Sequence, residues 1–337
     1  MNNNNKYDFS NHKVQILLVF YNGSKFFSEQ FDSLRNQTHK NIEILILNNG
    51  SNKDETIFLM NLTKNYINVT IYESSNNIGP FKGFEYLIDK VTSDYFAFCD
   101  QDDIWEAEKV ELMLSYLIQN NLLLCYSDLY VADQDCKIIK NSMWKDMNTP
   151  PLAKNSSLSI LIKNPITGCA TLCSSEIIEH SVPFVEGVPH DWIVGIVASC
   201  KNRLGFISER TIRYRHHGAN HAGGINFSLS GLRKNIKRRN SLDNYLNVRN
   251  VRRLALLKII FDLKRSDSLT KDKIFSKFIY FYLSSGNILR FVLSIFYFIA
   301  LLISANKIGF KNIIIDCLLN LIPRSQKGYD TKYLTWK

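Results

Sequence analysis

An acidic run directly follows a short apolar segment in the first third of the chain. Tyr95–Cys99 reads Tyr-Phe-Ala-Phe-Cys, and Asp100, Asp102 and Asp103 come immediately after it. An apolar run of about five residues predicts a buried strand, whereas unpartnered carboxylates are too costly to bury. Carboxylates and substrate phosphates together are the usual ligands of Mg²⁺. The run therefore predicts a metal and diphosphate site, with an acidic cap on a helix that begins near Trp105 as the alternative.

The segments around this run indicate which elements must position it. We expect strands over residues 14–21, 42–47, 69–72, 96–99 and 122–126, with helices of about a dozen residues between them. Strands that alternate with helices predict an α/β fold with a parallel sheet and right-handed crossovers. Polar loops follow the strands, so they meet at one rim of the sheet, where open α/β sheets bind ligands. This is the layout of a nucleotide-binding domain.

The charge of the chain is positive and unevenly distributed. The 337 residues include 41 Lys and Arg against 31 Asp and Glu, a formal net charge of +10, and residues 233–265 are dominated by Lys and Arg. A basic region can face nucleic acid, anionic lipid or a phosphorylated substrate. Because no aromatic-interleaved nucleic-acid motif accompanies it, we expect anionic lipid or diphosphate and no nucleic acid.

The cysteines and the first residues indicate the compartment. Seven cysteines form no CxxC pair and lie mostly in apolar surroundings, which favours reduced core cysteines over disulfides or a zinc site. The opening Met-Asn-Asn-Asn-Asn-Lys lacks the apolar core of a secretory signal. We therefore expect a protein of the cytoplasm.

Further short motifs extend the pattern from Val14 to Asn220, and together with the acidic run they resemble family 2 glycosyltransferases of the GT-A fold. The motifs, in order, are Phe20-Tyr21-Asn22, Asn48-Asn49-Gly50-Ser51, Asn77-Ile78-Gly79, Asp100-Gln101-Asp102-Asp103-Ile104-Trp105, Thr167-Gly168-Cys169, His190-Asp191-Trp192 and Tyr214-Arg215-His216-His217-Gly218. The acidic run and the Arg-x-His-Gly-x-Asn ending look most like bacterial rhamnosyltransferase-type members. The resemblance implies a GT-A fold, with a mostly parallel central sheet and flanking helices.

The resemblance also implies a nucleotide-sugar site along the rim. The turn after the second strand usually carries an acid that accepts a hydrogen bond from the base, and Asn48 and Asn49 replace it here. Asparagine accepts through its carbonyl oxygen but also donates and carries no charge, so both UDP- and dTDP-sugars remain candidates. Phe20 has strand core as its alternative role, and Lys82 a solvated helix face. The residues implied in donor binding are Phe20, Tyr21, Asn22, Asn48, Asn49, Asn77, Gly79, Lys82, Asp100 and Arg215.

The same resemblance implies a metal site. Asp102 would coordinate Mg²⁺ or Mn²⁺ at the donor diphosphate, Asp100 would contact the ribose or the metal, and His217 is a further candidate ligand. Asp103 is either a second ligand or the cap of the next helix.

Asp191 is the implied general base, because inverting transfer needs a carboxylate to take the proton of the acceptor hydroxyl. The alternative is that Asp191 only caps the helix that follows it. Trp192 would offer an apolar wall to a sugar ring, and His190 and Gly168 would lie at the acceptor side.

The C-terminal third differs from the rest in composition. We expect a glycosyltransferase domain over residues 12–224, a basic amphipathic helical region over 225–286, apolar helices over 287–323 and a tail over 324–337. The apolar run Phe291–Ala305 has 15 residues, fewer than the roughly 20 needed to span a bilayer. A buried core helix is one interpretation, and attachment to an anionic membrane surface is the other. We favour attachment at the cytoplasmic face of the cell membrane.

The pattern as a whole predicts an inverting glycosyltransferase. Its acceptor would be a surface polysaccharide such as O-antigen or capsule, or a lipid-linked glycan, and L-rhamnose from dTDP-rhamnose is the candidate donor. A nucleotidyltransferase is the first alternative, although it would need a Gly-rich, basic loop that Asn22-Gly23-Ser24 does not supply. A catalytically degenerate nucleotide-sugar-binding protein is the second, because Asn48 and Asn49 replace the usual acid.

Overall fold

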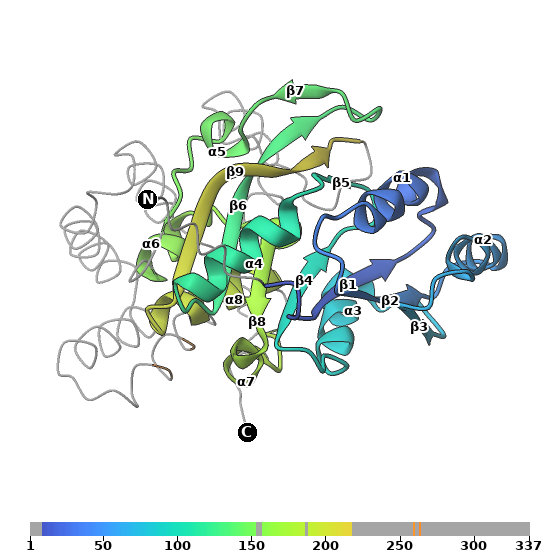
Figure 1. Ribbon diagram of the computed structural model, residues 1–337, viewed down its shortest axis with the longest axis horizontal. Helices are drawn as coiled ribbons and strands as arrows, with labels where there is room; N and C mark the ends of the chain where they lie inside the picture. The colour runs from blue at the N-terminus through green and yellow to red at the C-terminus, as the bar shows by residue number, and fades with distance from the viewer. Residues whose placement is uncertain (1–8, 153–156, 186–187, 218–258, 260–262, 264–337) are drawn as a thin grey trace, which may run out of the picture. The chain divides into compact units, whose positions relative to one another are not determined.

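The computed structural model describes residues 9–152, 157–185 and 188–217, together with residues 259 and 263 (Figure 1). The expected basic region, apolar helices and tail, residues 225–337, therefore lie almost entirely outside the described residues. Among the described helices, none is both long and apolar enough to cross a membrane. The chain divides into two compact units. The first contains the sheet and the site; of the second, the structure describes mainly the helix α6 (Ser157–Ile162).

The first half of the central sheet is parallel, as the alternation of strands and helices predicts. Within the described residues the sheet has nine strands in the order β3-β2-β1-β4-β8-β6-β9-β5, with β7 paired to β6. The four strands that pair in parallel are β1 (Val14–Phe20), β2 (Ile42–Asn49), β3 (Val69–Ser74) and β4 (Tyr95–Cys99). All seven residues of β1 are buried, which is expected of a central strand covered on both faces.

The second half of the sheet is mixed, so the expectation of a mostly parallel sheet is wrong there. β8 runs antiparallel to both β4 and β6, and β5 runs antiparallel to β9, whereas β6 and β9 are parallel. These strands are β5 (Ile104–Trp105), β6 (Leu124–Ala132), β7 (Ile138–Lys140), β8 (Thr171–Ser174) and β9 (Leu204–Arg215). Strand direction here depends on partners far apart in the chain, which the local apolar pattern does not reveal.

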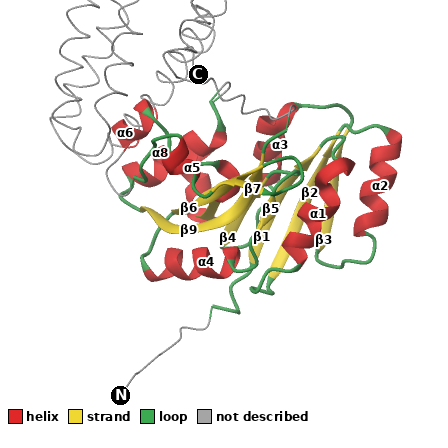
Figure 2. Ribbon diagram, turned by 90° about the horizontal axis from the view of Figure 1, so that it is seen from above, coloured by secondary structure: helices red, strands yellow, loops and turns green. Residues whose placement is uncertain are grey.

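Helices cover both faces of the sheet (Figure 2). On one face, α1 and α4 contribute apolar side chains such as Phe27, Phe31 and Met113 to the same buried cluster as the side chains of β1. On the other face, α3 lies so close that a Cβ at Gly83 would be 2.9 Å from the Val19 methyl groups. The main helices of this unit are α1 (Ser24–Arg35), α2 (Lys53–Thr63), α3 (Gly79–Ile88), α4 (Lys109–Gln119) and α8 (His190–Cys200). Smaller helical segments are α5 (Met143–Asp146), η1 (Gly168–Ala170), η2 (Ser175–Ile177) and α7 (Ile178–Ser181).

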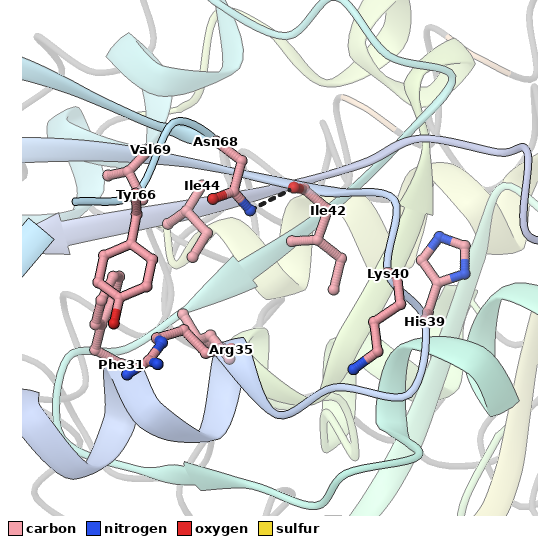
Figure 3. Close-up of a pocket in the computed structure, with 10 residues that line it drawn as sticks. Phe31, Arg35, His39, Lys40, Ile42, Ile44, Tyr66, Asn68 and Val69 are labelled. Atoms are coloured by element: carbon pink, nitrogen blue, oxygen red, sulfur yellow. Dashed lines mark hydrogen bonds between the residues drawn. The ribbon is translucent and has the colours of Figure 1, made fainter.

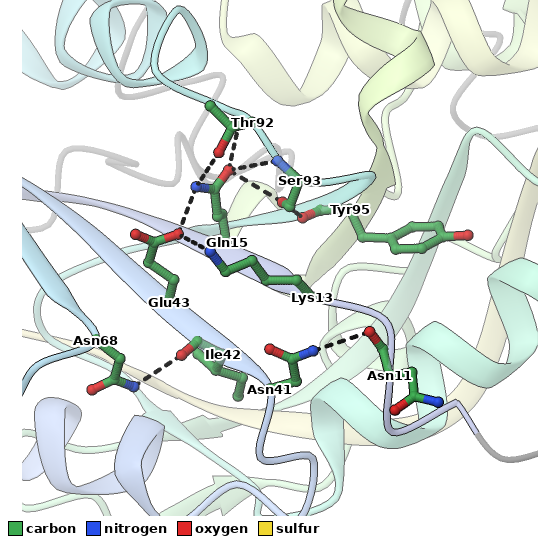
Figure 4. A network of polar contacts seen from close by, with 10 residues as sticks. All are labelled: Asn11, Lys13, Gln15, Asn41, Ile42, Glu43, Asn68, Thr92, Ser93 and Tyr95. Carbon is green, nitrogen blue, oxygen red and sulfur yellow. Dashed lines mark hydrogen bonds and ion pairs between the residues drawn. The ribbon is translucent and has the colours of Figure 1, made fainter.

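A buried glutamine fixes the segment that leads into β4 (Figure 4). Gln15, inside β1, accepts from the backbone N–H of Thr92 at 2.8 Å and of Ser93 at 3.1 Å. Its amide nitrogen donates to Glu43 on β2 at 2.8 Å. Because an unpaired buried amide is costly, this network holds the start of the strand whose other end carries the acidic run.

A small cavity of about 50 Å³ lies between α1 and the amino ends of β2 and β3 (Figure 3). Ile42, Ile44 and Phe31 contribute apolar walls, and the Arg35 guanidinium lies 4.4 Å from the centre of the Tyr66 ring. It lies at the end of the strands opposite to the acidic run.

Candidate active site

The polar residues predicted at the strand ends do meet at one rim. β1, β2 and β4 are parallel neighbours, so the segments after Phe20, Asn49 and Cys99 leave the same edge of the sheet. Asp100–Asp103, called the acidic turn below, connects β4 to β5. The helix after it begins at Lys109, with Glu108 as its N-cap. The acidic run is therefore not a helix cap, because Ile104 and Trp105 pair with β9 instead.

The acidic turn combines one buried carboxyl group with two that are partly exposed. Asp103 is fully buried; its Oδ1 accepts from the backbone N–H of Arg215 at 3.0 Å, and its Oδ2 has no hydrogen-bond partner among the described residues. Burial, with the charges of Asp100 and Asp102, raises the pKa of Asp103 well above its usual range. Burial, with the charge of Asp102, raises the pKa of Asp100 to about 7. Carboxyl groups this close together repel one another when ionised, so a bound cation would stabilise their charged forms.

Asp102 contacts His217, another predicted metal ligand, which lies near the C-terminal end of the domain. Its Oδ2 is 2.8 Å from Nε2 of His217, and the two side chains are 20% and 12% exposed. The His217 ring also packs on Phe26 of α1, with ring centres 4.8 Å apart. The structure therefore brings together two of the three predicted metal ligands, and Asp100 is two residues away. The carboxylate oxygens suit Mg²⁺ or Mn²⁺, and an imidazole nitrogen is a common ligand of transition-metal ions.

A buried lysine lies behind the acidic turn, and sequence reasoning missed it. Lys109 Nζ donates to the backbone oxygen of Cys169 at 2.7 Å and lies 3.0 Å from the centre of a Trp105 ring. Burial lowers the pKa of Lys109 to about 7. One ligand atom from each of Asp100, Asp103 and Cys169 lies within 4.8 Å of the others. A lysine in the first turn of a helix carries no local signal of burial, so only the fold reveals it.

Arg215 holds the acidic turn from behind. The side chain is 2% exposed, and its Nε donates to the backbone oxygen of Asp102 at 2.7 Å. Its other nitrogens donate to the backbone oxygen of Gln134 at 2.6 Å and to Glu29 on α1 at 2.5 Å. Protein oxygens thus already engage the guanidinium predicted to contact a phosphate, so such a contact would require these bonds to break.

The two asparagines at the end of β2 are buried, and their side chains hydrogen-bond to neighbouring residues of the rim. Asn48 donates to Thr56 at 3.0 Å and to the exposed carboxylate of Glu73 at 2.8 Å. Asn49 donates to Asn77 Oδ1 at 3.1 Å and accepts from the N–H of Ile78 at 3.0 Å. Sequence reasoning missed Glu73, a carboxylate beside Asn48 that comes from the neighbouring strand.

The residues at the end of β1 include one whose predicted role the structure corrects and one that hydrogen-bonds to the turn after β2. Phe20 is fully buried, with its ring 5.0 Å from that of Phe27, so the structure contradicts its predicted contact with the base and supports strand core. Tyr21 is 40% exposed. Asn22 adopts φ +45°, which asparagine tolerates better than most residues, and its N–H donates to Ser51 Oγ at 3.1 Å.

The remaining donor residues lie at the start of α3. Gly79 has φ +81° and donates its N–H to Asn77 Oδ1 at 2.8 Å. Lys82 is exposed on the next turn. Their contacts with a nucleotide stay a prediction.

The predicted base lies at the start of α8, next to His190, whose Nε2 atom is buried. Asp191 is half-buried in the first turn, where its Oδ1 accepts from the N–H of Trp192 at 2.8 Å. The ring of His190 packs 4.4 Å from Phe98 on β4, and burial lowers its pKa to about 4. A Cβ at Gly168 would lie 2.4 Å from Nε2 of His190. Gly168 adjoins Cys169, whose Sγ lies within 4.8 Å of carboxylate oxygens of Asp100 and Asp103, so α8 begins beside the acidic turn. Half-buried Trp192 follows Asp191.

Comparison with known proteins identifies relatives of this arrangement. Residues 15–178 match the family model described as Glycosyl transferase family 2. An uncharacterized glycosyltransferase of Haemophilus influenzae is 24% identical over 280 residues, which cover 79% of this chain and 85% of that protein. One from Rickettsia bellii is 26% identical over 62% of this chain, but the match spans only 29% of its own length.

The fold also resembles that of a solved structure. The crystal structure of S. aureus TarS 1-349 in complex with UDP-GlcNAc superposes with a TM-score of 0.53 at 12% identity, covering 77% of this chain and 68% of that one. At this identity the likeness concerns the fold alone, and it agrees with the expected α/β architecture.

Proposed function

We propose that this protein is a glycosyltransferase that moves a sugar, with inversion, from a nucleoside diphosphate donor to a hydroxyl group of a glycan; the match of residues 15–178 to the model of Glycosyl transferase family 2 supports this. The observation that carries the proposal is the 2.8 Å contact between Asp102 and His217 beside Asp100. It supports a divalent-cation site at the strand ends, where α/β sheets bind ligands. A bound Mg²⁺ or Mn²⁺ would offset the charge that develops on the departing diphosphate.

The acidic turn prepares this site through its own residues. Asp102 and His217 would exchange their mutual contact for contacts with the cation, and any proton on Asp100 would pass to solvent as the cation binds. Asp103 stays behind, held by Arg215, and keeps the turn in place. Fixed groups of this kind stabilise developing charge without rearranging during the reaction.

Asp191 is the proposed general base. The acceptor oxygen attacks the anomeric carbon on the face opposite the diphosphate, the bond from that carbon to the phosphate oxygen breaks, and the hydroxyl proton passes to the Asp191 carboxylate. Trp192, the next residue, would pack against the acceptor sugar ring. Gly168 and His190 would line the space between Asp191 and the metal site.

The nature of the donor is a narrower part of the proposal. TarS has been solved with UDP-GlcNAc, which supports a nucleotide-sugar at the equivalent rim, with Tyr21, Asn22, Asn77, Gly79 and Lys82 in reach of it. We retain dTDP-rhamnose as the candidate donor on the strength of the sequence motifs. A surface polysaccharide or lipid-linked acceptor at the cytoplasmic membrane face is proposed from the basic region 233–265.

A donor panel with Mn²⁺ tests the proposal through release of nucleoside diphosphate. We expect the wild type to release nucleoside diphosphate from at least one UDP- or dTDP-sugar. Asp102→Ala should lose both this release and metal-dependent binding. Asp191→Asn should lose the release but retain binding. Binding without turnover on any acceptor would instead favour a nucleotide-sugar-binding protein. No binding of any member of the panel would refute the proposal.

A further inference from the structure

Gln101, the second residue of the acidic turn, contacts a different loop from its acidic neighbours. Its Oε1 accepts from the backbone N–H of Tyr21 at 2.8 Å, and its Nε2 donates to the backbone oxygen of Tyr21 at 3.2 Å. One side-chain amide thus binds both polar backbone groups of one residue, as a neighbouring strand would. The residues are 80 positions apart in the chain.

Gly23 supplies the space that this contact needs. A Cβ at Gly23 would lie 2.4 Å from Oε1 of Gln101 and 2.7 Å from its Cδ. The backbone of Gly23 has φ −104°, a conformation open to any residue. The absent Cβ therefore leaves room for the Gln101 amide first and for the Phe20 ring, 3.1 Å from that position, second; the turn itself does not require glycine.

Tyr21, the residue that Gln101 binds, lies between the parts of the proposed donor site. The Tyr21 side chain is 40% exposed at the rim. The next residue, Asn22, accepts from the N–H of Asn52 at 3.0 Å and so ties the β1 turn to the β2 turn. Through Gln101 the same assembly is joined to Asp100 and Asp102.

We propose that Gln101 is a positioning residue that couples the acidic turn to the turn that receives the nucleotide. It holds Tyr21 and the metal-binding carboxylates in one arrangement before the ligand arrives, which lowers the ordering cost of binding. This role rests on the proposed function, since it requires a nucleotide at Tyr21.

The test uses a pair of substitutions that act on one contact. Gln101→Met keeps a side chain of similar length beside Gly23 but makes neither hydrogen bond. In Gly23→Ala the new methyl group displaces the Gln101 amide. Gln101→Ala alone is compared with the double variant Gly23→Ala/Gln101→Ala, in which the methyl group has no amide to displace and meets only the Phe20 ring, 3.1 Å away. Gln119→Ala, at the exposed end of α4, is the matched control.

We expect calorimetric titration of UDP and dTDP, with Mn²⁺, to show affinity about 10-fold lower in Gln101→Met and Gly23→Ala, the loss expected from two modest hydrogen bonds. The double variant should lose no more than Gln101→Ala alone, and Gln119→Ala should match the wild type. Hydrogen exchange at the Tyr21 amide, measured without ligand, should be faster in Gln101→Met.

Unchanged exchange at Tyr21, wild-type affinity in Gln101→Met, or additive losses in the double variant would each overturn the proposal. Wild-type protein that binds neither nucleotide would overturn the proposed function and the positioning role together. Wild-type binding that survives in Gln101→Met would overturn the positioning role alone.

Discussion

At the scale of single residues, the proposed metal site depends on two side chains, Asp102 and His217, that are 115 residues apart in the chain. Removing even an outer partner of a metal ligand lowers affinity by about 10- to 100-fold, so we expect Asp102→Asn and His217→Ala each to weaken Mn²⁺ binding by at least about 10-fold. Mn²⁺ titration of the full chain measures this. His216→Ala, the exposed neighbour of His217, is the control, and equal affinity in all variants would place the metal elsewhere.

His190 gives a prediction about pH. Its pKa is lowered by burial from 6.5 to about 4, so the folded protein favours the neutral ring. That contribution to stability is present above pH 6.5 and is lost as the pH falls toward about 4, by up to about 3 kcal/mol at about 1.4 kcal/mol per pKa unit. Melting temperatures from pH 7.5 to 4.5 should therefore fall less steeply in His190→Asn than in the wild type. An unchanged slope in His190→Asn, or an equal effect of His180→Asn, would contradict this.

At the scale of elements, Arg215 joins β9, α1 and the acidic turn. Glu29 and Glu176 have equally exposed side chains, at 62%, but their arginine partners are 2% and 26% exposed. Removing the partner of a buried charge costs about 3–5 kcal/mol, whereas a surface pair contributes about 0–1 kcal/mol. With Glu29 itself exposed, we expect Glu29→Gln to destabilise by about 1–3 kcal/mol and Glu176→Gln by less than about 1 kcal/mol.

Urea unfolding measures the loss of stability in both variants, and Mn²⁺ titration measures their affinity for the metal. Because Arg215 binds the backbone of Asp102, Glu29→Gln should also weaken Mn²⁺ binding, whereas Glu176→Gln should not. Equal effects of the two substitutions would mean that the Arg215 ion pair does not support the acidic turn.

The elements also show how far sequence reasoning reached. The apolar runs predicted β1, β2 and β4 closely, because each strand is buried along nearly its whole length. Two-residue β5 was predicted as the start of a helix, since its strand conformation depends on pairing with β9. The polar span between β6 and α6 contains β7 and α5, where Ser142 caps α5 and donates to buried Asp128 at 2.5 Å.

At the scale of the whole molecule, the rim could be predicted but its internal bonds could not. Placing polar loops after parallel strands was enough to bring Asn22, Asn49 and the acidic turn together. Nothing local indicated that Gln101 binds Tyr21, that Lys109 is buried, or that Arg215 faces Asp102 and not a ligand. Each depends on pairs more than fifty residues apart.

The basic region leads to a prediction about membranes. With residues 233–265 dominated by Lys and Arg, we expect the full chain to sediment with phosphatidylglycerol vesicles at low salt and to be released by about 0.5 M NaCl, because such attraction is screened within a Debye length. Phosphatidylcholine vesicles are the control. Equal binding to both, or none to either, would contradict the proposed location.

The central claim is that the acidic turn binds a nucleoside diphosphate through a divalent cation while Asp191 serves the chemistry. Calorimetric titration of UDP and dTDP into wild type, Asp102→Ala and Asp191→Asn, each with and without Mn²⁺, tests it most directly. The account predicts Mn²⁺-dependent binding in the wild type and Asp191→Asn, and none in Asp102→Ala. Binding that is independent of Mn²⁺, or that persists unchanged in Asp102→Ala, would contradict it.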